Sequence, residues 1–143
     1  MISIRAAAAE DLDVVKELLV ANDLPVLGVA EHFSGYLVAV DGGNVVGAIG
    51  LEPYGDTGLL RSAVVADSHK GKGIGAKLVD QLLEAATKAG VRRLVLLTNT
   101  AEGWFAGKGF RSIDRSTVTG PVTSSIEFTE ACPAHAVCME KLL

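Results

Sequence analysis

The chain has 143 residues, of which 49% are hydrophobic and 21% charged, and its formal net charge is −4. This length and composition predict one globular domain over residues 1–143. No apolar run approaches the roughly 18–20 residues of a membrane-spanning helix, and the acidic balance argues against a general nucleic-acid binder. The first residues lack a signal-peptide pattern, so we expect a cytoplasmic protein with neither a nucleic-acid nor a membrane partner.

The first half of the chain predicts alternating strands and helices. Leu12, Val15, Leu18 and Leu19 recur at helical spacing, and this helix should end near Asn22. The glycines of the turn at 41–44 tolerate positive φ and favour a hairpin. We expect a strand at 2–5 and a second short helix at 28–34. Two hairpin-linked strands should follow at 36–40 and 45–51, then a loop at 52–56 and an apolar strand at 58–66.

The second half predicts a long amphipathic helix between two buried strands. Ile74, Leu78, Leu82 and Ala86 fall on one face of this helix, which should run from about 73 to 89. After it we expect a strand at 92–98, a short helix at 101–108 and a strand at 110–114. A helix at 121–131 and a last strand at 136–143 should complete the chain. A hairpin followed by strand–helix–strand crossovers predicts an α/β fold with a mixed central sheet of six to seven strands and helices on both faces.

The most informative segment is the glycine-rich turn between the strand at 58–66 and the long helix. Glycines at 71, 73 and 75 allow a tight turn, and the helix start presents free N–H groups and a partial positive charge. With Lys70 and Lys72 beside them, these groups predict a site for a phosphate-bearing ligand. A nucleotide-hydrolysing P-loop is not expected, because Ala76 and Leu78 stand where glycine and serine or threonine are required.

Two segments carry a family resemblance. Lys70 to Gly75 (KGKGIG) resembles the phosphate-binding loop of the GNAT superfamily of N-acetyltransferases, and Asn99 to Phe110 (NTAEGWFAGKGF) resembles its second conserved block. The resemblance implies acetyl-CoA as cosubstrate, with a backbone N–H of the preceding strand polarising the thioester carbonyl. It places acetyl-CoA against ten residues: Val64, Val65, Lys70, Gly71, Lys72, Gly73, Ile74, Gly75, Ala76 and Asn99.

A narrower resemblance concerns the arsenic-resistance-associated N-acetyltransferases (the ArsN group), which are related to phosphinothricin acetyltransferases. It is carried by GLEPYGDTGLLRSAVV, LLTNTAEGWF and CPAHAVCM. It implies a small zwitterionic amine as acceptor, such as an organoarsenical or phosphinic amino-acid analogue, and a link to arsenic resistance.

The sequence departs from the superfamily pattern at two positions. Lys70 replaces the usual arginine, which keeps the charge but loses the bidentate contact to phosphate. Phe105 aligns with the tyrosine proposed as general acid and has no proton to donate. The CoA thiolate would then leave unprotonated or take a proton from water or from another residue.

Four side chains are candidates for the acceptor side of an acetyl transfer. Glu52 is the predicted general base, because it follows a buried strand where the sheet should open. Arg61, inside an apolar strand, needs an acidic partner, and we expect it to bind an acidic group of the acceptor; it can also pair with Glu52 or another acid, and the two roles can coexist. Trp104 and Phe105 are predicted to wall the acceptor pocket.

The cysteines leave an alternative function open. Cys132 and Cys138 are expected to be small buried thiols, and no metal site is predicted from their spacing. The alternatives are an acyl-CoA-binding module without turnover, which Phe105 favours, and an arsenic- or metal-responsive module that uses both thiols. The enzyme is expected to act as a monomer or a homodimer.

Overall fold

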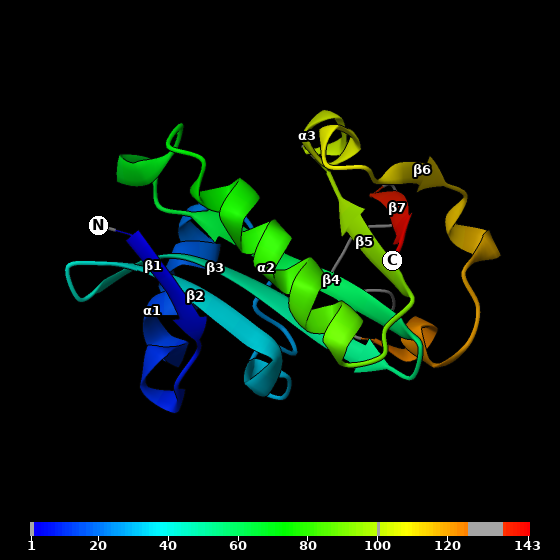
Figure 1. The fold of residues 1–143 in the computed structure, drawn as a ribbon, viewed down its shortest axis with the longest axis horizontal. Coiled ribbons are helices and arrows are strands. Elements are labelled where there is room, and N and C mark those ends of the chain that lie inside the picture. Colours follow the sequence, from blue (N-terminus) through cyan, green and yellow to red (C-terminus); the bar gives the residue numbers. More distant parts are fainter. Residues whose placement is uncertain (1, 100, 126–135) are drawn as a thin grey trace.

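A computed structural model of the protein describes residues 2–99, 101–125 and 136–143, which form one sheet with helices around it (Figure 1). The sheet has seven strands in the order β1-β2-β3-β4-β5-β7-β6. The strands are β1 (Ile2–Ala6), β2 (Tyr36–Asp41), β3 (Asn44–Tyr54), β4 (Thr57–Val65), β5 (Arg93–Thr98), β6 (Arg111–Ile113) and β7 (Val137–Leu142). The helices are α1 (Leu12–Ala21), α2 (Ile74–Lys88) and α3 (Glu102–Gly107). The predicted mixed α/β architecture is confirmed.

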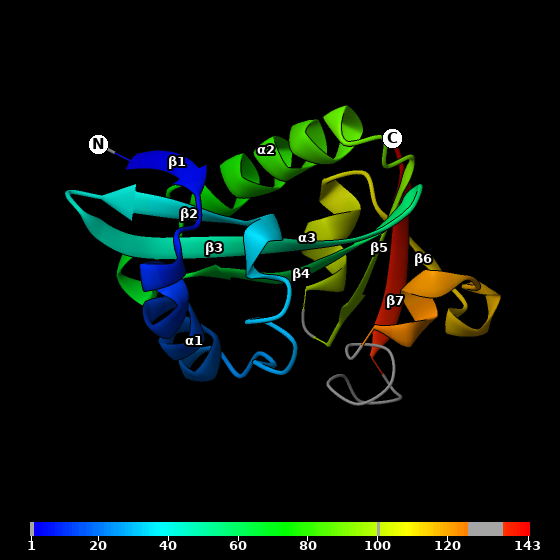
Figure 2. The same ribbon diagram turned by 90° about the horizontal axis from the view of Figure 1, so that it is seen from below.

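The sheet opens between its two central strands. β4 and β5 are parallel, and they pair only over Thr57–Leu59 and Arg93–Val95. Beyond Leu59 they separate, and Figure 2 shows β5 steeply inclined to β3 and β4. Because α2 connects these two strands, its first turn lies at the open end of the gap between them. The fold therefore brings the glycine-rich turn to a break in the sheet.

Helices cover both faces of the sheet, as predicted. The apolar face of α2 packs against one side together with Phe105 of α3, and Val15 and Leu19 of α1 pack against the other. Figure 2 shows α2 and α1 on opposite sides of β2, β3 and β4. Beyond the gap, Val118 and Val122 cover the face that α1 does not reach. None of the helices in the described part of the chain is long and apolar enough to cross a membrane.

Three of the predicted elements are wrong in part. Residues 52–56 are not a loop, because β3 continues to Tyr54 and Gly55, at φ +73, makes a tight turn into β4. Residues 28–34 form successive turns with i→i+3 hydrogen bonds, followed by a 3-10 turn at Phe33–Gly35. The helix expected at 121–131 is a 3-10 turn over Pro121–Ser124, and its residues after Ser125 lie outside the described residues.

Candidate active site

The gap between β4 and β5 is a cleft with two connected parts. The larger cavity, of about 670 Å³, is lined by Leu60–Val65, by Leu96–Asn99 and by Asn22–Pro25 at the end of α1. The smaller cavity, of about 350 Å³, lies at the glycine-rich turn and the start of α2. Six residues line both parts: Ala63, Val64, Val65, Lys70, Ala101 and Phe105. We call the first part the face cavity and the second the loop cavity.

The loop cavity has the features of an anion site. Gly71 and Gly73 have φ of +81° and +77°, a conformation that residues with a Cβ rarely adopt. A Cβ added at either glycine would meet no heavy atom within 4 Å, so the backbone is open to a ligand. Gly73 is the N-cap of the 15-residue helix α2, whose first N–H groups face the turn. These residues fit the pyrophosphate of a CoA molecule.

The predicted cofactor residues fall into three groups in the structure. Eight line the loop cavity: Val64, Val65, Lys70, Gly71, Gly73, Ile74, Gly75 and Ala76. Asn99 lines the face cavity instead, beyond the end of β5. Lys72 lines neither cavity, and its side chain is exposed. Their roles in binding stay predictions.

Lys70 connects the two parts of the cleft. Its Nζ lies 2.7 Å from Asp67 Oδ1 and donates a hydrogen bond of 2.9 Å to Asn22 Oδ1 at the end of α1. His69 is held in a similar way, with Nε2 2.9 Å from Asp41 Oδ2 on β2. The turn is therefore tied to both α1 and β2 through side chains.

The two aromatic residues of α3 lie at different places in the cleft. Phe105 is buried and packs edge-on against Trp104 and Phe110, with ring centroids 5.0 and 5.6 Å apart, and it lines both cavities. Trp104 is 45% exposed and lies over Gly75, where it lines the loop cavity and not the face cavity. The acceptor-pocket role predicted for Trp104 stays a prediction, and in the structure its ring lies against the glycine-rich turn.

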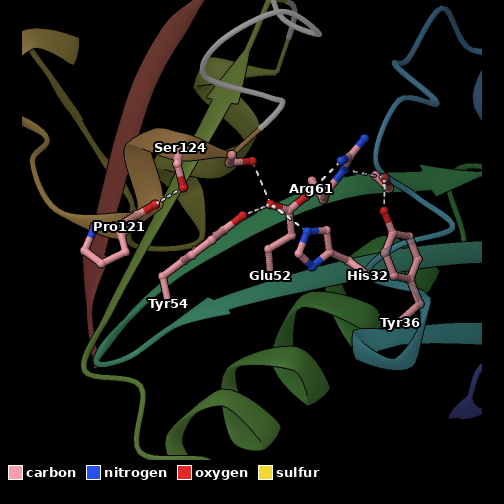
Figure 3. Close-up of polar contacts among 9 residues, drawn as sticks. His32, Tyr36, Glu52, Tyr54, Arg61, Pro121 and Ser124 are labelled. Atoms are coloured by element: carbon pink, nitrogen blue, oxygen red, sulfur yellow. Dashed lines mark hydrogen bonds and ion pairs between the residues drawn. The ribbon is translucent and has the colours of Figure 1, made fainter.

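A buried charge pair lies on the sheet face near the face cavity. The side chains of Glu52 and Arg61 are fully buried, and Arg61 Nη1 donates a hydrogen bond of 2.8 Å to Glu52 Oε2 (Figure 3). Glu52 Oε1 accepts hydrogen bonds from Tyr54 Oη at 2.5 Å and from Ser125 Oγ at 2.6 Å. His32 Nε2 is 3.8 Å from the same oxygen. Of the two partners considered for Arg61, the structure shows Glu52, and the contact of Arg61 with an acceptor stays a prediction.

These contacts decide the protonation state of Glu52. Burial raises the pKa of Glu52, but the hydrogen bonds from Ser125, Tyr54 and Arg61 outweigh burial and hold the pKa below its ordinary value. Glu52 is therefore ionised at neutral pH. Because donors occupy both of its oxygens and its basicity is lowered, the geometry suits a carboxylate that fixes Arg61 and Tyr54 better than a strong base. Its role as general base stays a prediction.

The network continues along β4 through a β-bulge. Gly50 faces Arg61 and Ala48 faces Val64, so two residues of β4, Ser62 and Ala63, stand opposite one residue of β3. Ser62 has a left-handed backbone, φ +59, and its Oγ lies 3.3 Å from Arg61 Nε and 2.6 Å from the hydroxyl of Tyr36. The bulge bends β4 where it lines the cleft.

Sequence reasoning missed four members of this network. Tyr54 lies two residues after Glu52 on the same strand face, and reading 52–56 as a strand would have placed the two together. Tyr36, Ser62 and Ser125 come from separate segments and meet only through the register of the sheet and the return of the chain after β6. No local pattern marks them.

The structure gives little support to a thiol site. Cys138 is buried in β7, and burial raises the pKa of its thiol, which disfavours the thiolate that binds metals. Cys132 lies outside the described residues. Among the residues that the structure does describe, no group of three or more histidine, cysteine, aspartate or glutamate side chains could hold a metal ion.

Comparison with known families identifies the fold. Residues 9–110 match the model of the acetyltransferase (GNAT) family, which includes β2, β3, β4, the glycine-rich turn, α2, β5 and α3. The chain belongs to the GNAT family. The GNAT superfamily resemblance is therefore confirmed, whereas the narrower resemblance to the arsenic-resistance-associated group is not tested by this match.

One relative shares about a third of its residues with this chain over the matched region. The amino-acid acetyltransferase of Mycobacterium tuberculosis (strain ATCC 25618 / H37Rv) is 34% identical over 116 residues, which are 80% of this GNAT chain and 60% of that protein. The chain thus spans less than two thirds of that relative.

Solved structures share the fold. N-acetylglutamate synthase from Neisseria gonorrhoeae, complexed with coenzyme A and N-acetyl-glutamate, superposes with a TM-score of 0.86 at 20% identity, over 100% of this chain and 35% of that one. Rv2747 from Mycobacterium tuberculosis, in complex with CoA and NLQ, gives a TM-score of 0.84 at 24% identity over 99% of both chains. At these identities the likeness establishes the GNAT fold.

Proposed function

We propose that this chain transfers an acetyl group from acetyl-CoA to the amino group of a small, amino-acid-like acceptor. The observation that carries the proposal is the two-part cleft. An anion site at the start of α2 and a separate cavity over a charged sheet face meet at Ala63–Val65 and Phe105. A two-substrate transfer needs such a meeting point, because both reactants must be held in contact while each keeps its own binding surface.

The loop cavity fits the cosubstrate by its chemistry. Backbone N–H groups at Gly73 to Ala76 and the positive end of α2 suit a pyrophosphate, and Lys70 adds a cation. Val64 and Val65 continue from this site along β4, which in the described part of the chain does not pair with β5 beyond Leu59. When bound, acetyl-CoA would supply the thioester. The exposed edge of β4 would then polarise its carbonyl.

The face cavity would hold the acceptor. Arg61 of β4 lines this cavity and is held by the buried carboxylate of Glu52 on the neighbouring strand β3, and the bulge at Ser62 bends β4 where it lines the cleft. The similarity to an amino-acid acetyltransferase and to structures with coenzyme A and N-acetyl-glutamate or NLQ supports an acceptor with an α-amino group. An organoarsenical or phosphinic amino-acid analogue is the narrower acceptor that the sequence resemblance implies.

The proton balance uses few side chains. An acceptor that enters as an ammonium ion must lose one proton before it attacks and a second as the amide forms. Glu52 is ionised but weakly basic, so His32, at 3.8 Å from it, and water are further proton acceptors. Phe105 cannot protonate the leaving thiolate, and a thiol pKa of about 8.5 makes departure as the thiolate feasible near neutral pH.

Release of free CoA tests the proposal. The protein with acetyl-CoA is assayed with the L-amino acids, simple amines, and organoarsenical and phosphinic amino-acid analogues. We expect turnover that depends on both substrates. An acyl-CoA-binding module without turnover would show acetyl-CoA binding and no CoA release with any amine, and that result would overturn the proposed function.

A further inference from the structure

Two residues other than glycine have a left-handed backbone in the described part of the chain, and both line the face cavity. Asp23 has φ +58 and Ser62 has φ +59. This conformation costs energy for residues with a Cβ, and such strain concentrates at functional sites. At Ser62 the structure shows a reason, because its hydroxyl joins Arg61 to Tyr36. At Asp23 the side chain makes no such contact within the described residues.

The backbone at Asp23 is a helix C-cap that would favour glycine. The N–H of Asp23 donates to the Val20 carbonyl at 3.2 Å, and the N–H of Leu24 donates to the Leu19 carbonyl at 2.9 Å. These two hydrogen bonds are those of a Schellman motif at the end of α1, in which the left-handed residue is usually glycine. Local structure therefore gives no advantage to aspartate here, and Asp23 is exposed and lines the face cavity.

The charges around the face cavity leave this carboxylate uncompensated. Among its described lining residues, Asp23 is the one acidic side chain. The cations Arg61 and Lys70 each have an acidic partner, Glu52 and Asp67. An aliphatic amine enters such a cavity as an ammonium ion at neutral pH, and the carboxylate of Asp23 can accept its hydrogen bonds.

We infer that Asp23 is a specificity-determining residue that binds the ammonium group of the acceptor. This inference rests on the proposed function. The ammonium is bound before it loses the proton that acetyl transfer requires, so Asp23 contributes to acceptor binding and not to the later attack. Its removal should raise KM for a cationic amine and leave kcat near that of the wild type. The carboxylate of Asp23 should add no affinity for amines that are neutral at pH 7.

Two substitutions separate the carboxylate from the backbone. Asp23→Asn keeps the size and the tolerance of a left-handed backbone, and Asp23→Gly removes the strain together with the side chain. KM and kcat are measured for the best L-amino acid of the panel and for an aromatic amine that is neutral at pH 7. The same variants are melted without ligand and with acetyl-CoA, and KM is followed as ionic strength rises.

We expect both variants to raise KM for the amino acid about tenfold, with kcat and the stabilisation by acetyl-CoA unchanged. KM should rise with salt in the wild type and stay flat in Asp23→Asn. Asp23→Gly should melt about 2–4 °C higher than the wild type without ligand. An unchanged KM for the amino acid, or an equal rise for the neutral amine, overturns the inference alone. Absence of turnover of every amine by the wild type overturns the proposed function and the inference together.

Discussion

The two parts of the cleft are built by opposite means. Most of the loop cavity is made by one segment, from Val64 to Ala76, whose glycine-rich turn is exposed, and Ala101, Trp104 and Phe105 complete it. The face cavity is lined by residues from separate strands and turns, and its Arg61 is held by a buried network in which both oxygens of Glu52 accept hydrogen bonds. Single substitutions in the loop cavity should therefore lower ligand affinity and leave protein stability nearly unchanged. Substitutions in the buried network should lower protein stability first.

Breaking the buried pair should have the largest effect on stability. Arg61→Met leaves the Glu52 carboxylate buried without its cation, which costs about 3–5 kcal/mol and should lower Tm by roughly 10 °C or more. The double variant Glu52→Leu with Arg61→Met removes both charges and should recover much of the lost Tm, as measured by thermal melting.

A matched surface pair provides the control for this prediction. Lys88 and Glu84 form an ion pair on α2 with side chains 75% and 67% exposed. Lys88→Met should leave Tm within experimental error of the wild type, because exposed pairs contribute little. Equal Tm losses for Arg61→Met and Lys88→Met would show that the network does not stabilise the sheet face.

The next effect concerns the loop cavity and should appear in affinity. Gly73→Ala forces a Cβ into a backbone with φ +77, at a cost of about 1–2 kcal/mol, and should weaken acetyl-CoA binding about tenfold or more. Gly75→Ala is the matched control, since its φ is outside the left-handed region and an added Cβ would sit 3.5 Å from Trp104, an ordinary contact. Isothermal titration with acetyl-CoA should separate the two variants, and equal affinities would contradict the cradle described for Gly73.

Acid should weaken the face cavity. The folded-state pKa of Glu52 lies below the ordinary value of 4.5, because the hydrogen bonds from Ser125, Tyr54 and Arg61 outweigh the effect of burial. The stability that these bonds add is therefore present above pH 4.5 and lost as pH falls through the folded-state pKa. Tm measured from pH 7 downward should fall less steeply in Glu52→Gln than in the wild type. Parallel curves would show that Glu52 does not titrate as described.

The smallest effect is expected at Trp104, the single tryptophan of the chain. Its ring is half-exposed over Gly75, so acetyl-CoA bound at the turn should change its fluorescence. Trp104→Phe should keep Tm near that of the wild type and weaken acetyl-CoA binding only a few-fold, roughly the value of one exposed aromatic contact. A large loss of acceptor affinity instead would show that Trp104 contributes to the acceptor pocket.

The sequence was sufficient where the site is local. The strand, the glycine-rich turn and the amphipathic helix α2 each carry their own pattern, so their positions could be predicted, and the cost of an arginine in an apolar strand predicted that Arg61 needs an acidic partner without deciding which one.

The rest depends on tertiary geometry. Pro53 and Gly55 gave residues 52–56 the composition of a loop, although they continue β3 into a tight turn. The bulge at Ser62 and the left-handed cap at Asp23 could not be predicted, because neither position is a glycine, the residue that usually marks a left-handed backbone. The orientation of Trp104 is set by how α3 packs, which periodicity over six residues does not define.

The central claim is that the open gap between β4 and β5 binds acetyl-CoA through the turn at Lys70–Gly75. A thermal melt with and without acetyl-CoA tests it most directly. At about 100 times the dissociation constant a ligand stabilises the folded state by roughly 2.7 kcal/mol, which for this chain length is a rise of several degrees in Tm. The account predicts that rise in the wild type and a smaller one in Lys70→Ala. No change in the wild type at millimolar acetyl-CoA would contradict it.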